Sequence, residues 1–132
     1  MTPFPLKFVT PDGLIFDGQA EELIVRSTTG DLAIMAHHIN YVTPLGMGKA
    51  TVIANGKRRE AACIGGMLAM INNEANLIAT TFEWADEIDL DRAKRAKEAA
   101  EARIAAAKDD DKELLLAKAK LHRALVRIGV KH

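Results

Sequence analysis

The stretch Ala-Thr-Val-Ile-Ala-Asn-Gly-Lys-Arg-Arg-Glu-Ala-Ala-Cys-Ile, residues 50–64, places an Asn-Gly dipeptide between two runs of strand-like composition. Asn55-Gly56 is the strongest short-range signal for a β-hairpin, because a type I′ turn requires positive φ angles at both central residues. Further turn signals divide the surrounding sequence at Pro11-Asp12-Gly13, Asp17-Gly18, Thr29-Gly30-Asp31 and Asn72-Asn73-Glu74. Short strands separated by turns every ~8–12 residues predict a β-sandwich or a β-barrel.

The chain changes character along its length. All four prolines lie within the first 44 residues and eight of the nine glycines within the first 66. No glycine or proline occurs between Met67 and Ile128. Since these residues mark turns and loops, their distribution indicates two regions. We place the boundary within Phe82–Glu87, which gives a β domain over residues 1–84 and a helical domain over residues 85–132.

The second region is predicted to be an antiparallel two-helix hairpin, which makes the fold class α+β. Asp89 can cap a helix that runs to about Ala107. The segment 108–112 then interrupts the helical pattern, and so short a connection makes the two helices antiparallel. The first helix carries an alanine stripe, and the second an apolar seam that is expected to face it. These positions are Ala93, Ala96, Ala100 and Ala107, and Leu114, Leu121, Leu125 and Ile128.

Composition is that of a soluble globular protein. The 132 residues are 48% apolar and 27% charged, with a formal net charge of zero. No apolar run approaches the ~20 residues that a membrane span needs, and the first residues do not have the basic and apolar pattern of a signal peptide. The single cysteine, Cys63, cannot form an internal disulfide and fits a reducing compartment.

Catalysis by a nucleophile has little support in the sequence. Ser27 is the only serine, and Cys63 lies in an apolar strand, where a thiol is usually an inert core residue. The segment Gly46–Thr51 resembles a phosphate-binding loop but lacks its first glycine and its metal-binding hydroxyl, so we interpret it as a turn. We therefore predict no catalytic residues.

Metal and nucleic-acid sites are also not predicted. His37 and His38 are adjacent, so on a strand they point to opposite faces, and no second cluster has the spacing of metal ligands. The last helix is basic, but no aromatic residues alternate with its lysines and arginines. A solvated helix face explains that pattern better than nucleic-acid binding does.

Three arginines are the strongest candidates for a functional site. A turn near Asp110 places residues whose numbers sum to about 220 opposite each other, so Arg92 would face Arg127, and Arg123 lies one helical turn from Arg127. One interpretation is that nearby carboxylates pair with these arginines and that Asp89 is only a helix cap. The other is that the arginines bind phosphate oxygens, for which their planar donors are well suited. Groups around Glu83, Ile88 and Asp89 would then accept hydrogen bonds from a base.

The chain resembles the family of epsilon subunits of bacterial F-type ATP synthases over nearly its whole length. The resemblance is carried by Val9-Thr10-Pro11-Asp12-Gly13, Gly30-Asp31-Leu32-Ala33-Ile34, His38 with Val42-Thr43-Pro44-Leu45, Gly65-Gly66, and Ile88-Asp89-x-x-Arg92-Ala93. It implies an N-terminal antiparallel β-sandwich, a C-terminal helical hairpin, and a non-catalytic rotor subunit at the cytoplasmic face of the cell membrane. The last of these stretches fits the family's ATP-binding motif. The resemblance implies a nucleotide site made of Glu83, Ile88, Asp89, Arg92, Ala93, Arg123 and Arg127.

Partners and regulation are likewise implied by the resemblance. The sandwich would bind the gamma subunit and rest on the c-ring of the proton-translocating complex, with Asp31 and His38 in the contacting loops. The hairpin would be compact with ATP bound, with or without magnesium. When extended into the catalytic alpha/beta head, it would inhibit ATP hydrolysis. The alternatives are a free-standing ATP-responsive adaptor and, among enzymes, a small hydrolase.

Overall fold

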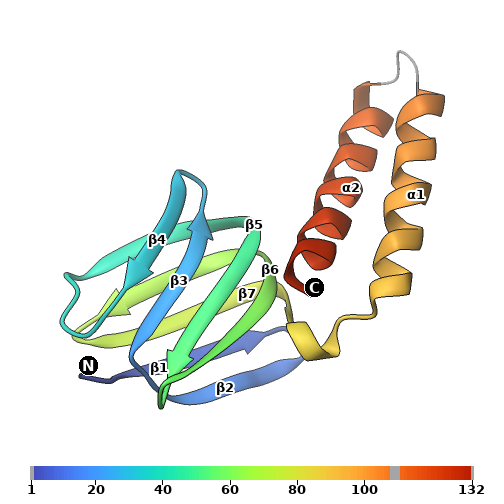
Figure 1. The fold of residues 1–132 in the computed structure, drawn as a ribbon. Helices are drawn as coiled ribbons and strands as arrows, with labels where there is room; N and C mark the ends of the chain where they lie inside the picture. The colour runs from blue at the N-terminus through green and yellow to red at the C-terminus, as the bar shows by residue number, and fades with distance from the viewer. Residues whose placement is uncertain (1, 108–110, 132) are drawn as a thin grey trace. The chain divides into compact units, whose positions relative to one another are not determined.

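The computed structural model describes residues 2–107 and 111–131, and the chain divides into two compact units between Trp84 and Ala85 (Figure 1). The predicted connection between the helices falls on residues 108–112, of which 108–110 lie outside the described residues. The first unit contains β1 (Phe4–Thr10), β2 (Gly13–Ala20), β3 (Glu22–Ser27), β4 (Gly30–Ile34), β5 (Tyr41–Ala54), β6 (Lys57–Ile71) and β7 (Glu74–Trp84). The second contains the 3₁₀ helix η1 (Ala85–Glu87), α1 (Leu90–Ala107) and α2 (Asp111–Lys131).

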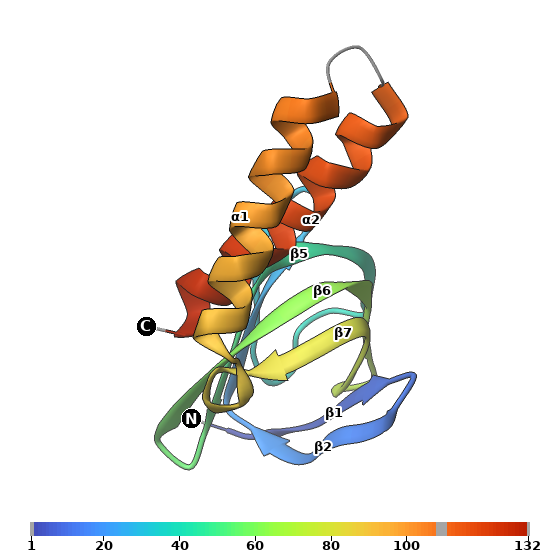
Figure 2. The ribbon, with the colours of Figure 1, turned by 90° about the vertical axis from the view of Figure 1, so that its right-hand side faces the viewer.

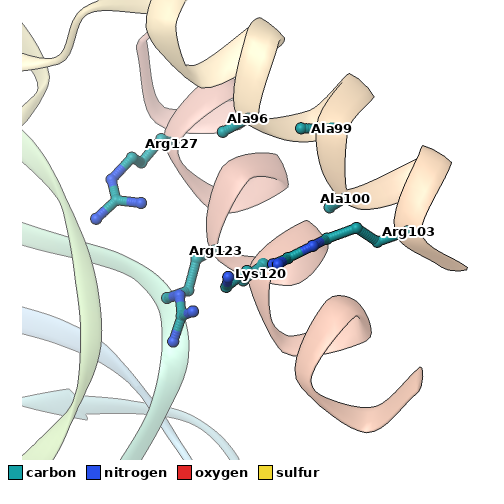
Figure 3. Close-up of a pocket in the computed structure, with 7 residues that line it drawn as sticks. All are labelled: Ala96, Ala99, Ala100, Arg103, Lys120, Arg123 and Arg127. Carbon is teal, nitrogen blue, oxygen red and sulfur yellow. The ribbon is translucent and has the colours of Figure 1, made fainter. Parts of the chain in front are cut away.

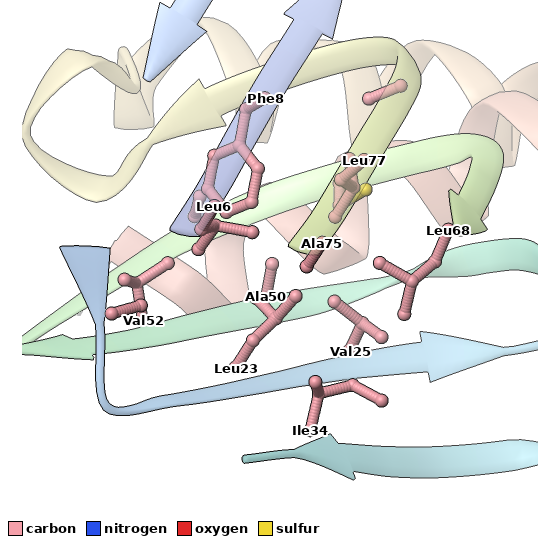
Figure 4. Close-up of a cluster of buried hydrophobic side chains, with 14 of the residues drawn as sticks. Leu6, Phe8, Leu23, Val25, Ile34, Ala50, Val52, Leu68, Ala75 and Leu77 are labelled. Atoms are coloured by element: carbon pink, nitrogen blue, oxygen red, sulfur yellow. The ribbon is translucent and has the colours of Figure 1, made fainter. Parts of the chain in front are cut away.

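The seven strands form one sheet in the order β2-β1-β7-β6-β5-β3-β4. Neighbouring strands are antiparallel except for β1 and β7, which are parallel. Although β1 and β3 are separated by three strands in this order, Leu6 of β1 and Leu23 of β3 belong to the same buried cluster (Figure 4). The sheet therefore folds over on itself into two layers around one core (Figure 2). This arrangement confirms the predicted sandwich.

Two-residue turns join the long central strands. Asn55 and Gly56 have φ angles of 53° and 71°, as the type I′ prediction requires. Asn72 and Asn73, at 49° and 67°, form the matching turn between β6 and β7. Asparagine is one of the few side chains that tolerates this left-handed backbone region.

Two predicted turns are wrong. Asp17-Gly18 lies within β2, where it pairs with β1, and Gly46–Thr51 lies within β5. The glycine at 48 is required by close packing instead, because a Cβ there would lie 2.5 Å from the Cβ of Arg26. The neighbouring strand thus explains a glycine that local sequence assigns to a turn.

Cys63 is 4% exposed within the sandwich core. Burial disfavours the thiolate and raises the pKa of this thiol to about 12. Since the thiolate is the nucleophilic form, the side chain is an inert core residue at neutral pH, as its apolar sequence context predicts.

Alanines from both helices form the centre of the hairpin. Ala93 and Ala100 of α1 and Ala117 and Ala124 of α2 are each at most 3% exposed. Leu125, predicted to lie in the apolar seam, is 45% exposed instead. Small side chains on both faces let two helices approach closely, which explains why alanines rather than leucines are buried here. Neither helix is both long enough and apolar enough to span a membrane, among the residues that the structure describes.

Candidate functional site

A groove of about 330 Å³ lies on the hairpin (Figure 3). Its lining consists of Ala96, Ala99, Ala100 and Arg103 from α1, and Lys120, Arg123 and Arg127 from α2. No acidic side chain lines it among the described residues. An alanine wall beside four cationic side chains is suited to an anionic ligand with an apolar part, and guanidinium groups favour phosphate oxygens.

The helical repeat brings the α2 cations to one face. Lys120, Arg123 and Arg127 are spaced by three and four residues, so they follow one another on the same side of the helix. Arg123 and Arg127 are half-buried, whereas Lys120 and Arg103 are exposed. Two of the arginines proposed from the sequence therefore do line one cavity.

The motif residues at the start of α1 occupy a different place. The Asp89 carboxylate accepts a hydrogen bond from the backbone N–H of Arg92 at 3.1 Å, and the Asp89 carbonyl accepts one from Ala93 at 3.0 Å. Asp89 is thus the N-cap of α1. Ile88 and Ala93 are buried, the Arg92 side chain is exposed, and none of these residues lines the groove. Glu83 belongs to β7, in the other compact unit.

The register of the hairpin explains part of this separation. Two contacts show which residues of the hairpin face each other. Arg103 of α1 forms an ion pair with Glu113 of α2, and the Lys131 ammonium donates a hydrogen bond to the Ala85 carbonyl at 3.1 Å. In both contacts the residue numbers sum to 216, rather than the expected ~220. Arg127 is therefore level with Asp89, and Arg92 is level with Ala124. The predicted pairing of Arg92 with Arg127 is therefore offset by three residues, about 4.5 Å along the helix axis.

Arg103 and Lys120 were missed by sequence reasoning. Their signal was helical spacing: Lys120 precedes Arg123 by three residues, and Arg103 follows the groove residue Ala99 by four. Both residues lie away from the motif at the α1 N-terminus, Arg103 in the last turns of α1 and Lys120 in the middle of α2. Only the shared cavity shows that these two cations belong with the others.

The two loop residues proposed as partner contacts lie in the sandwich. Asp31 pairs with Arg26 across the β3–β4 ladder, at 2.6 Å between carboxylate and guanidinium, and both side chains are more than half exposed. His38 lies between β4 and β5, with its ring near Tyr41. The neighbouring backbone is held by a hydrogen bond from the N–H of His37 to the Asn73 side chain at 2.7 Å. The loop therefore presents an ordered surface that includes Ile39, which is 74% exposed.

Replacing Asp89 with alanine should lower the stability of the hairpin by about 1 kcal/mol, because the first turn of α1 loses its side-chain acceptor. Asparagine at the same position retains an acceptor and should recover most of the loss. Amide hydrogen exchange at Arg92 and Ala93 measures the effect. Equal exchange in wild-type and alanine variants would show that the cap contributes nothing.

Comparisons with known proteins cover both units. Residues 3–85 match the family model described as the beta-sandwich domain of the ATP synthase delta/epsilon chain, and residues 86–131 match its long alpha-helix domain. The ATP synthase epsilon chain of Caldicellulosiruptor bescii is 39% identical over 128 residues, covering 97% of this chain and 93% of the relative. That of Lacticaseibacillus casei is 40% identical over 131 residues, covering 96% and 92%.

Solved structures share the fold. A chain in the mitochondrial ATP synthase of Euglena gracilis, an OSCP/F1/c-ring assembly, has a TM-score of 0.88 at 18% identity, covering 100% of this chain and 83% of that one. A chain in the central stalk/c-ring structure from Tetrahymena thermophila has a TM-score of 0.59 at 13% identity, with coverages of 89% and 95%. Because both family matches and the bacterial relatives span nearly all of the sequence, the chain belongs to the family of epsilon chains of F-type ATP synthase, the non-catalytic stalk subunits of that enzyme complex.

Proposed function

We propose that this subunit inhibits ATP hydrolysis through its hairpin, and that ATP bound in the groove favours the compact hairpin. The observation that carries the proposal is that one cavity takes its lining from both helices. A ligand that contacts Arg103 of α1 and Arg123 of α2 at once requires the two helices to be together. In this proposal the triphosphate contacts the α2 arginines, and the base lies toward Ile88, Asp89 and Ala93 at the α1 N-terminus.

Thermodynamic linkage gives the size of the stabilisation that bound ATP would provide to the compact hairpin. A ligand that binds only the compact state stabilises that state by RT ln(1 + [L]/Kd), about 2.7 kcal/mol at a hundredfold excess over Kd. Such an increment changes the ratio of two nearly balanced states by about a hundredfold. Abundant ATP would keep the hairpin compact, and scarce ATP would release the helices to enter the alpha/beta head and block wasteful hydrolysis.

The sandwich is proposed to attach the subunit to the rotor. Leu14, Val9, Ile78 and Met67 are neighbours in register across β2, β1, β7 and β6, and they are 58%, 36%, 57% and 42% exposed. A continuous exposed apolar row marks a protein interface more often than scattered apolar residues do. We assign it to the gamma subunit, and we assign the loops of Asp31 and His38 to the c-ring. The subunit would then be peripheral to the cytoplasmic face of a proton-translocating membrane complex.

Calorimetric titration of ATP into the full chain, with and without magnesium, tests the site. The wild-type chain should bind saturably. Arg92→Ala should weaken binding if the α1 motif contributes to the site, and unchanged affinity in this variant would restrict the ligand to the groove. If the wild-type chain shows no heat of binding, the sensor role is wrong, whereas membership in the epsilon family does not depend on the result.

Reconstitution tests inhibition. An ATP synthase complex that lacks this subunit should hydrolyse ATP more slowly at low ATP concentration after the full chain is added back. Residues 1–84, which contain the whole sandwich core, should bind the complex without that inhibition. Equal inhibition by the fragment and the full chain would assign the effect to the sandwich.

A further inference from the structure

The turn between β4 and β5 contains a residue in an unusual backbone conformation. The backbone N–H of His38 donates a hydrogen bond to the Met35 carbonyl at 3.2 Å, which closes a four-residue turn, and His37 in its third position has a φ angle of 63°. A type II turn requires a positive φ angle at this position, which glycine usually supplies. A residue with a side chain keeps such a conformation where the surrounding structure holds it.

Two asparagine side chains connect this turn to the turn between β6 and β7. The Asn73 side-chain oxygen accepts a hydrogen bond from the N–H of His37 at 2.7 Å, and the Asn40 side-chain oxygen accepts one from the N–H of Asn72 at 2.8 Å. Each segment thus supplies one side-chain acceptor and one backbone donor, at the same end of the sandwich (Figure 1). The β5–β6 ladder ends before both turns, so these two hydrogen bonds, the asparagine clamp, hold them together beyond it.

The clamped turns adjoin exposed apolar side chains. Ile39 is 74% exposed, and Val42 and Ile71 are 55% and 48% exposed. Val42 pairs with Ala69 of β6. Ile71 and Met67 lie two residues to either side of Ala69, so they share the outer face of the sheet with it. Because Met67 belongs to the exposed row assigned above to the gamma subunit, the clamp lies where the two proposed rotor contacts meet.

We propose that Asn40 and Asn73 are positioning residues that hold the two turns as one rigid surface before the sandwich meets the c-ring. This inference rests on the proposed attachment to the c-ring and adds to it the residues that prepare the contact surface. Free turns would have to become ordered on binding, and the conformational freedom lost at that moment lowers the affinity. A clamp formed beforehand avoids this loss. Breaking it therefore weakens docking while every apolar side chain of the surface is retained.

Amide hydrogen exchange tests whether Asn73 holds the first turn. Asn73→Gly removes the acceptor for the His37 N–H and introduces a residue that tolerates the φ angle of 67° at this position. Exchange at His37 should become about fivefold faster, as expected for the loss of one neutral hydrogen bond. Asn72→Gly is the matched control, because Asn72 also has a positive φ angle, 49°, but contributes only its backbone N–H to the clamp. It should leave exchange at His37 unchanged.

The second hydrogen bond is tested in the same way. Asn40→Ala removes the acceptor for the Asn72 N–H, so exchange at Asn72 should become about fivefold faster. Asn40→Asp retains an oxygen acceptor and should restore the protection of this N–H.

Affinity for a detergent-solubilised gamma–c-ring assembly that lacks this subunit tests the role in docking. The double variant Asn40→Ala/Asn73→Gly of the full chain should bind about tenfold more weakly than wild type, whereas Asn72→Gly should bind as tightly. A merely structural role would lower the stability of the sandwich instead. Urea unfolding followed by Trp84 fluorescence should therefore give similar midpoints for Asn73→Gly and Asn72→Gly.

The outcomes separate this inference from the proposed attachment. If the wild-type chain binds the assembly and the double variant binds as tightly, the positioning role is overturned and the attachment stands. The same follows if Asn72→Gly weakens binding as much as Asn73→Gly does, since backbone flexibility would then be the cause. If the wild-type chain does not bind, the attachment is wrong and the positioning role is overturned with it.

Discussion

Replacing Gly66 with alanine should lower the free energy of unfolding of the sandwich by at least about 3 kcal/mol. A Cβ at this position would lie 2.0 Å from the Ile78 carbonyl oxygen and 2.8 Å from the Ala79 Cα, both of which are backbone atoms that cannot rotate away. The φ angle of Gly66 is also +125°, a region that side-chain-bearing residues rarely adopt. To accommodate alanine at this position, either β6 and β7 must separate locally or the backbone of β6 must change its conformation. Both changes disturb the centre of the sheet.

Gly13→Ala is the matched control for this variant. Gly13 has the same φ angle of +125°, but a Cβ there would meet nothing within 4 Å. It therefore isolates the backbone strain, which should cost about 1–2 kcal/mol. Urea unfolding followed by the fluorescence of Trp84, the single tryptophan and a buried one, measures both. Equal losses would show that strain alone, without the clash, determines the effect at Gly66.

The double variant Arg123→Gln/Arg127→Gln should weaken ATP binding by at least about a hundredfold. Each arginine is expected to make a hydrogen bond to a charged phosphate, and one such contact contributes ~1.5–3 kcal/mol, so losing two costs 3 kcal/mol or more. The structure of the hairpin should survive, because the alanines at its centre are unchanged. Calorimetric titration gives the affinity, and the rise in melting temperature with added ATP gives an independent value.

A second double variant separates specific contacts from net charge. Lys112→Gln/Lys118→Gln removes the same charge from exposed positions of α2 outside the groove lining. It should weaken binding by only a few fold, since exposed charges at a distance are screened by salt. If both double variants weaken ATP binding equally, long-range attraction rather than the groove holds the nucleotide.

Local sequence signals predicted much of this fold. The Asn55-Gly56 turn, the helical region without glycine or proline, and the cap at Asp89 all depend on a few consecutive residues, and the structure contains each of them. Two of the wrong predictions concern glycines inside strands. Gly18 and Gly48 carry the same local signal as a turn, but pairing with β1 and packing against Arg26 decide their conformations.

For the candidate site too, some features follow from the local sequence and others from the packing of the two helices. Motifs along the chain are enough to predict the fold class and the family, and helical periodicity, a local property, is enough to place Arg123 and Arg127 on one face of a helix. That Arg103 and Lys120 share a cavity with them, and that Arg92 does not, depends on how the two helices pack. The buried alanines of both helices set the register of the hairpin, and residues distant in sequence meet only once that packing is formed.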